Sequence, residues 1–218
     1  MRPVLAEFAL RYPGVNNAAV VSQWSMNYMS IVVPATLACV LTRDQAIDFW
    51  RDDSVLRLDA GQPLALHFAG PLPALAAAER ADYFSRWVHE HLAPLFATLA
   101  LAGGLAPKIL WGNFVAIWDG AFARLDPDLS RPGFAEAHRW LEPVTVNQGR
   151  LKLRGLQRQV ASPAPEICPQ LPLRRHCCLH YQLHPLVEGE PLVLCESCPK
   201  LHRLPLAEQV GYLHSLYD

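Results

Sequence analysis

Residues 174–181 read RRHCCLHY and residues 194–200 read LCESCPK, and these two stretches decide how the C-terminal part of the chain folds. In a C-x-x-C unit, two thiolates converge on one metal while the backbone amides between them point at the sulfurs. We therefore predict a small module folded around metal, with four cysteines as ligands: Cys177, Cys178, Cys195 and Cys198.

Two kinds of metal centre fit this spacing. Cytosolic thiols are kept reduced, so disulfides are not expected in a cytoplasmic chain. Zinc knuckles usually draw on spaced pairs, and successive side chains of extended backbone diverge, so Cys177 and Cys178 need an unusual turn to bind one ion. A 2Fe–2S cluster offers more coordination positions to four thiolates. Spacing alone leaves zinc and iron–sulfur both open.

The histidines near the cysteines are predicted to be solvated or hydrogen-bonded side chains. His176 directly precedes Cys177, but Rieske-type centres, which do use histidine, need two at a characteristic spacing. The same prediction holds for three further histidines: His180, His184 and His202.

Basic residues and two further cysteines complete this part of the chain. Arg174, Arg175 and Lys200 are predicted to neutralise the negative charge of a metal–thiolate centre, with attraction of an anionic complex or an electron donor as the alternative. Cys168 is predicted to be structural filler, and Cys39 a small buried hydrophobe.

Upstream, apolar residues recur at helical spacing. The pattern predicts long helical segments over 16–41, 75–101 and 107–125. Proline is expected to break the first segment at Pro34 and to divide or kink the second at Pro94. Three tryptophans within these patterns are predicted to be core side chains: Trp24, Trp111 and Trp118.

Shorter elements are predicted between and after the long helices. Apolar runs at 55–58 and 64–68 flank a turn-forming segment and indicate a β-hairpin. The remaining expectations are a short helix from Thr42 and Asp44 through Ile47 and Trp50, a helix through Trp140 and Leu141, a brief strand at 151–153 and a linker at 161–165.

Composition excludes several function classes. The 218 residues are 51% hydrophobic and 18% charged with a net charge of −1, so there is no broad basic surface for nucleic acid. The N-terminus lacks the layout of a secretory signal. The uncharged stretch 92–107 is shorter than the ~20 residues that span a membrane. We predict a cytoplasmic protein, with peripheral contact at the inner membrane left open.

Three segments resemble a known family. The pattern RRHCC…CESCP over 174–199 resembles the C-terminal signature of FhuF-type siderophore-iron reductases. Ser22–Tyr28 followed by Pro34 is similar to the family's S-x-W-x-x-x-Y…P helix, and Leu110–Asn113 resembles its L-W-x-N segment. One departure is the gap before Cys195, which is usually shorter in the family and reads here as a longer loop, 180–193.

The resemblance implies a cytoplasmic ferric-siderophore reductase. Its four cysteines, Cys177, Cys178, Cys195 and Cys198, would bind a 2Fe–2S cluster that passes one electron to siderophore-bound Fe(III). The implied partners are a ferric siderophore, with the hydroxamate type favoured, and a separate electron donor such as a ferredoxin or flavin reductase, because no dinucleotide or phosphate motif is present. The alternative is a non-catalytic siderophore-binding or interaction module with a structural four-cysteine zinc site.

The predicted fold class is α+β: a mainly helical domain with a small antiparallel hairpin or sheet and a cysteine-rich C-terminal iron–sulfur module. We expect a body over 1–142, a connecting segment over 143–173 and the 2Fe–2S-binding module over 174–218, packed as one compact unit in a monomer.

Overall fold

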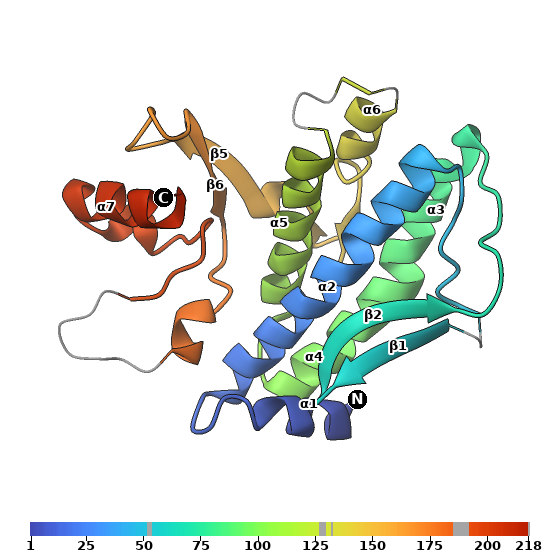
Figure 1. Ribbon diagram of the computed structural model, residues 1–218, viewed down its shortest axis with the longest axis horizontal. Helices are drawn as coiled ribbons and strands as arrows, with labels where there is room; N and C mark the ends of the chain where they lie inside the picture. Colours follow the sequence, from blue (N-terminus) through green and yellow to red (C-terminus); the bar gives the residue numbers. More distant parts are fainter. Residues whose placement is uncertain (52–53, 127–129, 132, 185–191, 218) are drawn as a thin grey trace.

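The computed structural model describes residues 1–218 except 52–53, 127–129, 132, 185–191 and 218. Its centre is a pair of long helices, α2 (Asn17–Thr42) and α5 (Pro107–Leu125), which pack against each other. The helix α4 (Ala93–Gly103) contacts both, and α1 (Arg2–Ala9) lies against α2 near its beginning (Figure 1). The chain is mostly helical with small antiparallel sheets, so the α+β prediction is confirmed.

Helix α2 begins at a side-chain cap, since Asn16 Oδ1 accepts from the Ala18 N–H at 2.8 Å. The predicted break at Pro34 is wrong, because the helix continues through this proline to Thr42. Burial of Val33 and Leu37 on either side of it holds both halves in the core. That packing outweighs the hydrogen bond that proline removes.

Helix α2 is also long and apolar enough to cross a membrane, judged by length and composition alone. It carries no Lys, Arg, Asp or Glu over its 26 residues, so it is a longer uncharged run than 92–107. Of the 18-residue stretch of the helix that is apolar enough for this, 44% is buried inside the fold. A core helix of a soluble protein passes the same test, so the helix does not by itself assign a location.

The second predicted helical segment is present but subdivided. It comprises η1 (Ala77–Glu79), α3 (Arg80–Arg86), the π-helical η2 (Trp87–Leu92) and α4. Pro94 stands in the first turn of α4, directly after the π-helical turn, so the helix changes type beside the proline where a division or kink was predicted. The helices predicted over 107–125 and through Trp140 are present as α5 and α6 (Phe134–Arg139).

The predicted hairpin is also present, as the antiparallel pair β1 (Ser54–Asp59) and β2 (Gln62–Phe68) against α2. The short helix predicted through Trp50 is wrong. Asp44 has a left-handed backbone, and its carbonyl accepts from the Leu75 N–H at 2.8 Å. The Asp44 carbonyl is therefore bonded to a distant segment of the chain and does not accept the hydrogen bond that would start a helix at Asp44.

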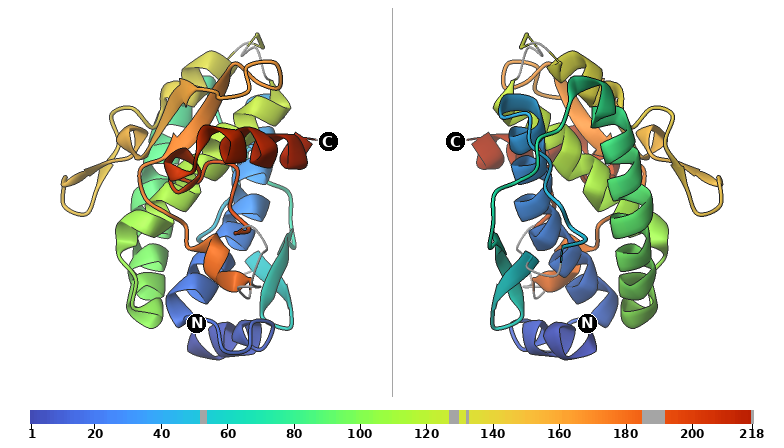
Figure 2. Two further views of the ribbon diagram at one scale, coloured as in Figure 1. Left: turned by 90° about the vertical axis from the view of Figure 1, so that its left-hand side faces the viewer. Right: turned by 90° about the vertical axis from the view of Figure 1, so that its right-hand side faces the viewer.

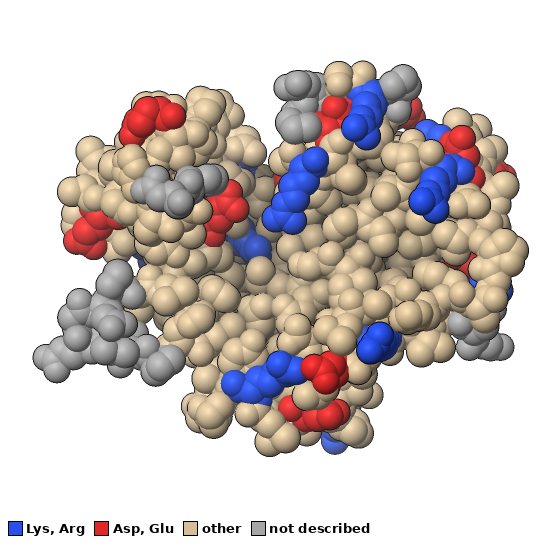
Figure 3. Space-filling view, viewed as in Figure 1, with Lys and Arg blue, Asp and Glu red and all other residues tan. Residues whose placement is uncertain are grey.

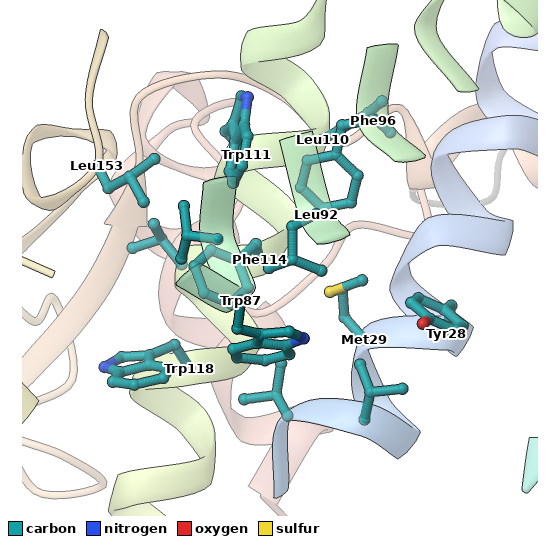
Figure 4. Close-up of a cluster of buried hydrophobic side chains, with 14 of the residues drawn as sticks. Tyr28, Met29, Trp87, Leu92, Phe96, Leu110, Trp111, Phe114, Trp118 and Leu153 are labelled. Atoms are coloured by element: carbon teal, nitrogen blue, oxygen red, sulfur yellow. The ribbon is translucent and has the colours of Figure 1, made fainter. Parts of the chain in front are cut away.

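The main core is aromatic (Figure 4). The predictions for Trp24, Trp111 and Trp118 are confirmed, because each side chain is at most 1% exposed. Trp24 Nε1 also donates to the Gly61 carbonyl at 2.9 Å, which ties the turn of the β1–β2 hairpin to α2.

Gly61 provides a test of this packing. Its φ is +73°, and a Cβ there would lie 2.5 Å from both Phe8 N and Val4 O. We expect Gly61→Ala to lower the free energy of unfolding by at least ~2 kcal/mol, because left-handed backbone costs roughly 1–2 kcal/mol and the methyl adds a clash. Gly14→Ala is the control in urea denaturation, since Gly14 has a similar φ with nothing within 4 Å of an added Cβ. Equal losses in both variants would contradict the proposed clash.

The C-terminal part contains two further antiparallel pairs, β3 (Thr145–Val146) with β4 (Leu151–Lys152) and β5 (Gln157–Ala161) with β6 (Gln170–Arg174). β4 confirms the brief strand predicted at 151–153. The segment predicted as a linker is instead the start of the β5–β6 turn, closed by a hydrogen bond from the Ser162 N–H to the Pro169 carbonyl at 3.2 Å.

Short helical turns and a last helix follow, namely η3 (Arg154–Leu156), η4 (His180–Leu183), η5 (Leu201–Arg203) and α7 (Leu206–Tyr217). Figure 1 and Figure 2 show α7 and the β5–β6 hairpin on one side of the helical bundle. A second, smaller hydrophobic cluster lies here, made of Ala164, Leu171, Leu194, Cys198, Leu201 and Leu213. Strand β6 leads from this cluster directly into the first cysteine pair.

Candidate functional site

The four cysteines of the quartet lie together, although they come from two separate loops. Cys178 Sγ is 3.3 Å from Cys195 Sγ. Cys177 hydrogen-bonds Cys178 and Cys198, and Cys195 likewise contacts Cys198. We call this closed set of thiol contacts the cysteine ring.

The ring is partly shielded from solvent. Cys178 and Cys198 are each 2% exposed, whereas Cys177 and Cys195 are half-buried. None of the four forms a disulfide. Within the described ranges, no group of three or more His, Cys, Asp or Glu side chains is arranged as a ready metal site, so metal binding by the ring remains a prediction.

Backbone N–H groups point at the ring sulfurs. The Leu179 N–H donates to Cys177 Sγ at 3.4 Å, and the His180 N–H donates to Cys178. Leu179 adopts a left-handed φ of +66°, which for a bulky residue costs roughly 1–2 kcal/mol. This turn directly follows the adjacent cysteine pair, where the Leu179 and His180 N–H groups meet the two sulfurs.

The thiol contacts also set the acidity of the ring. Hydrogen bonds from Cys177 and Cys195 lower the pKa of Cys178, and the nearby Arg174 charge lowers it further against the opposing effect of burial. Hydrogen bonds from the same two thiols lower the pKa of Cys198, helped by backbone N–H groups. The ring therefore favours thiolates at two positions, and thiolate is the form that binds metal.

Arg174 lies buried beside the ring, with 4% of its surface exposed. Its Nε donates to Ser197 Oγ at 2.7 Å and its Nη1 to Asn113 Oδ1 at 2.6 Å. Among the described carboxylates, none forms an ion pair with it. A buried cation is stable only when it is compensated, and the thiolate favoured at Cys178 is a negative charge beside it.

Asn113 extends this contact into the helical bundle. Its side chain is fully buried, and its Nδ2 lies 3.0 Å from Ser22 Oγ and 2.9 Å from Ser25 Oγ. Ser22 Oγ in turn donates to the Cys178 carbonyl at 2.6 Å. We call this set the Arg174 network: Arg174, Asn113, Ser22, Ser25 and Ser197.

Ser22 and Asn113 lie in the two N-terminal segments that resemble the family, but the sequence alone predicts no role for either residue. The structure shows that they connect α2 and α5 to both cysteine loops. One signal in the sequence marks Asn113: it is a polar residue in the otherwise apolar run 109–118.

The histidines and the spare cysteine lie around the ring. Among the described residues, no hydrogen bond joins a histidine side chain to a ring sulfur; His180 instead contacts Gln23 Oε1 at 3.1 Å and His184 at 3.4 Å. Burial, and then the charges of Lys108 and Arg175, lower the pKa of His176.

The two remaining cysteines are half-buried. Cys168 packs against the smaller hydrophobic cluster, with its Sγ 3.8 Å from Ser162 Oγ. Cys39 lies on α2, where burial raises the pKa of its thiol. Half of the long loop before Cys195, residues 185–191, lies outside the described residues.

Among the described residues, two separate openings reach the cysteine ring. The Cys195 groove, of about 450 Å³, lies between α2, α5, β5, β6 and the Cys195 loop; Figure 3 shows the surface hollowed beside the C-terminal part. The Cys177 pocket, of about 310 Å³, lies between the start of α5 and the segments 175–179 and 199–203.

The family of ferric iron reductase FhuF-like transporters matches residues 22–189 of this chain. The match begins at Ser22, spans Asn113 and Arg174, and ends after the first cysteine pair but before Cys195. No curated protein matches the chain. Because the family model covers about three quarters of the sequence, the chain belongs to the ferric iron reductase FhuF-like transporter family.

Proposed function

We propose that this protein is a cytoplasmic 2Fe–2S reductase of siderophore-bound Fe(III). The observation that carries the proposal is the cysteine ring: four thiols from two loops meet beside a buried guanidinium and several backbone N–H groups. Membership of a ferric iron reductase family supports the same reaction.

The donor set suits an anionic iron–sulfur centre. Cys177, Cys178, Cys195 and Cys198 would hold the cluster, and four thiolates are what a 2Fe–2S centre requires. When bound, such a cluster supplies one electron at a time. Arg174 and the N–H groups of Leu179 and His180 oppose the accumulated negative charge, and hydrogen bonds to sulfur are among the features that set a cluster's potential.

The Cys195 groove is the proposed site for the ferric siderophore. Amide side chains line it, and Gln157 Oε1 has no hydrogen-bond partner among the described residues. Asp119, a carboxylate in the groove, already accepts from Arg154 and Gln157. Glu196 and two arginines, Arg124 and Arg174, also line the groove, so its cationic and anionic side chains are equal in number. A lining of amides with balanced charge favours a neutral hydroxamate complex over a highly charged one.

The chemistry needs little beyond placement of the substrate. Oxygen donors hold Fe(III) more strongly than Fe(II) because attraction scales with metal charge. One electron therefore loosens the complex and releases iron. No acid–base residue is required for that step, and the groove's role is to hold the Fe(III) complex against the half-buried Cys195 edge of the ring.

The test begins with anaerobic purification of the whole chain. We expect a reddish-brown protein with about two iron and about two sulfide per chain and an EPR signal after reduction. Mixing the reduced protein with a ferric hydroxamate should reoxidise it and release Fe(II). A colourless protein with one zinc ion would contradict the proposal and favour an interaction module with a structural zinc site.

A further inference from the structure

The Cys177 pocket is strongly basic. Its lining comprises four cationic residues and no carboxylate; the cations are Lys108, Arg175, Lys200 and Arg203. The chain as a whole has a net charge of −1, so this is a local concentration of positive charge. It lies against Cys177, one of the two half-buried members of the ring.

These cations are available to a partner. Lys108, Arg175 and Arg203 are exposed, and none of them takes part in an ion pair within the part of the chain that the structure describes. Lys200 Nζ lies 4.3 Å from the centre of the Tyr181 ring, a contact that leaves its charge uncompensated. The Arg174 charge, by contrast, is buried within its network.

The pocket and the Cys195 groove are separate. Lys108 stands in the first turn of α5, whereas the groove begins at Ala116 and includes Asp119. At 1.5 Å per residue, Lys108 and Asp119 are about 16 Å apart along the helix axis. Two partners can therefore approach the ring at the same time.

The observations favour a macromolecular occupant for the pocket. Its volume of about 310 Å³ is smaller than that of the groove, and its exposed cations suit carboxylates presented from a protein surface. Opposite charges on two docking faces speed association and fix their orientation.

We propose that this basic face docks an acidic one-electron donor protein, and that the electron enters at the Cys177 edge and leaves through the Cys195 groove. The inference rests on the proposed function. In each turnover the donor protein is oxidised by one electron and the Fe(III) complex is reduced by one electron, and no atom or proton is transferred.

The test uses Lys108→Glu combined with Arg175→Glu and a reduced, acidic 2Fe–2S ferredoxin as the donor. At low salt we expect reduction by ferredoxin in stopped flow to be at least tenfold slower, with a weaker salt dependence than in the parent protein. Reoxidation of chemically reduced protein by a ferric hydroxamate should be unchanged.

The matched control is Arg150→Glu combined with Lys152→Glu, which makes the same charge change at exposed positions outside the pocket. Equal slowing in the control would overturn the proposal, because total charge would then explain the effect. A normal ferredoxin rate with slower reoxidation by an anionic ferric catecholate would also overturn it and would assign the pocket to the iron complex.

A binding measurement separates this proposal from the proposed function. Oxidised ferredoxin should bind the parent chain in calorimetry, with binding weakened at least tenfold by the Lys108 and Arg175 substitutions. If that binding is found but a ferric hydroxamate is not reduced, docking stands and the proposed substrate fails. If no ferredoxin binding is detected while ferric hydroxamate is still reduced, docking fails alone.

Discussion

Cys178→Ser is expected to abolish the visible absorption of the anaerobically purified protein and to remove nearly all of its iron. Cys178 is 2% exposed and touches both Cys177 and Cys195, so its loss breaks the cysteine ring in two places. A serine hydroxyl is not ionised at neutral pH and cannot replace the thiolate as a ligand. Absorption spectra and iron analysis measure the result, and Cys195→Ser should behave in the same way.

Cys168→Ser is the matched control for this experiment. It makes the same chemical change in the same part of the chain, but the Cys168 thiol donates to Ser162 Oγ, and no hydrogen bond among the described residues joins it to the ring. We expect it to retain the absorption and the iron content. Full absorption in the Cys178 variant would mean that the ligands are assigned wrongly.

Arg174→Met should have the second largest effect, a loss of about 2–4 kcal/mol in the free energy of unfolding of the loaded protein. Asn113 Oδ1 and Ser197 Oγ would each lose a buried donor, and an unsatisfied buried group costs ~1–3 kcal/mol. The loss should be smaller in protein stripped of metal, where the guanidinium has less negative charge to compensate. Denaturant unfolding of both forms measures the difference.

Arg175→Met is the control, because Arg175 is the next residue and is exposed. We expect it to change stability by less than about 0.5 kcal/mol. A reduction potential gives a second readout: removal of the Arg174 charge should make the potential more negative, since a nearby cation favours the reduced, more negative centre. An unchanged potential with a large loss of stability would show that the residue acts only on the fold.

Much of the fold was predictable from periodicity. The helix α5 and the β1–β2 hairpin follow from local sequence patterns, and tertiary contacts leave both elements as those patterns predict. Two of the failed predictions have one cause in common, which is tertiary contact. Pro34 remains helical because both sides of it are buried, and Asp44 does not start a helix because its backbone pairs with Leu75.

The cysteines were identifiable from spacing, but their surroundings were not. Asn113 is 91 residues from Ser22 and 61 from Arg174, so no local pattern relates them. The β5–β6 hairpin was missed because its first strand, QRQVA, is mostly polar. The basic pocket similarly joins Lys108 to Arg203, which only the folded chain brings together.

The hydrogen bond from Ser22 to the Cys178 carbonyl also has a consequence for biogenesis. It joins residues 156 positions apart, so it forms only after the chain has been synthesised through Cys178. Helices α2 and α5 can pack earlier, with Ser22 and Asn113 still lacking their C-terminal partners. The cysteine loops are therefore ordered after the helical body on which they pack, and under the proposed function a cluster would be inserted only at that later step.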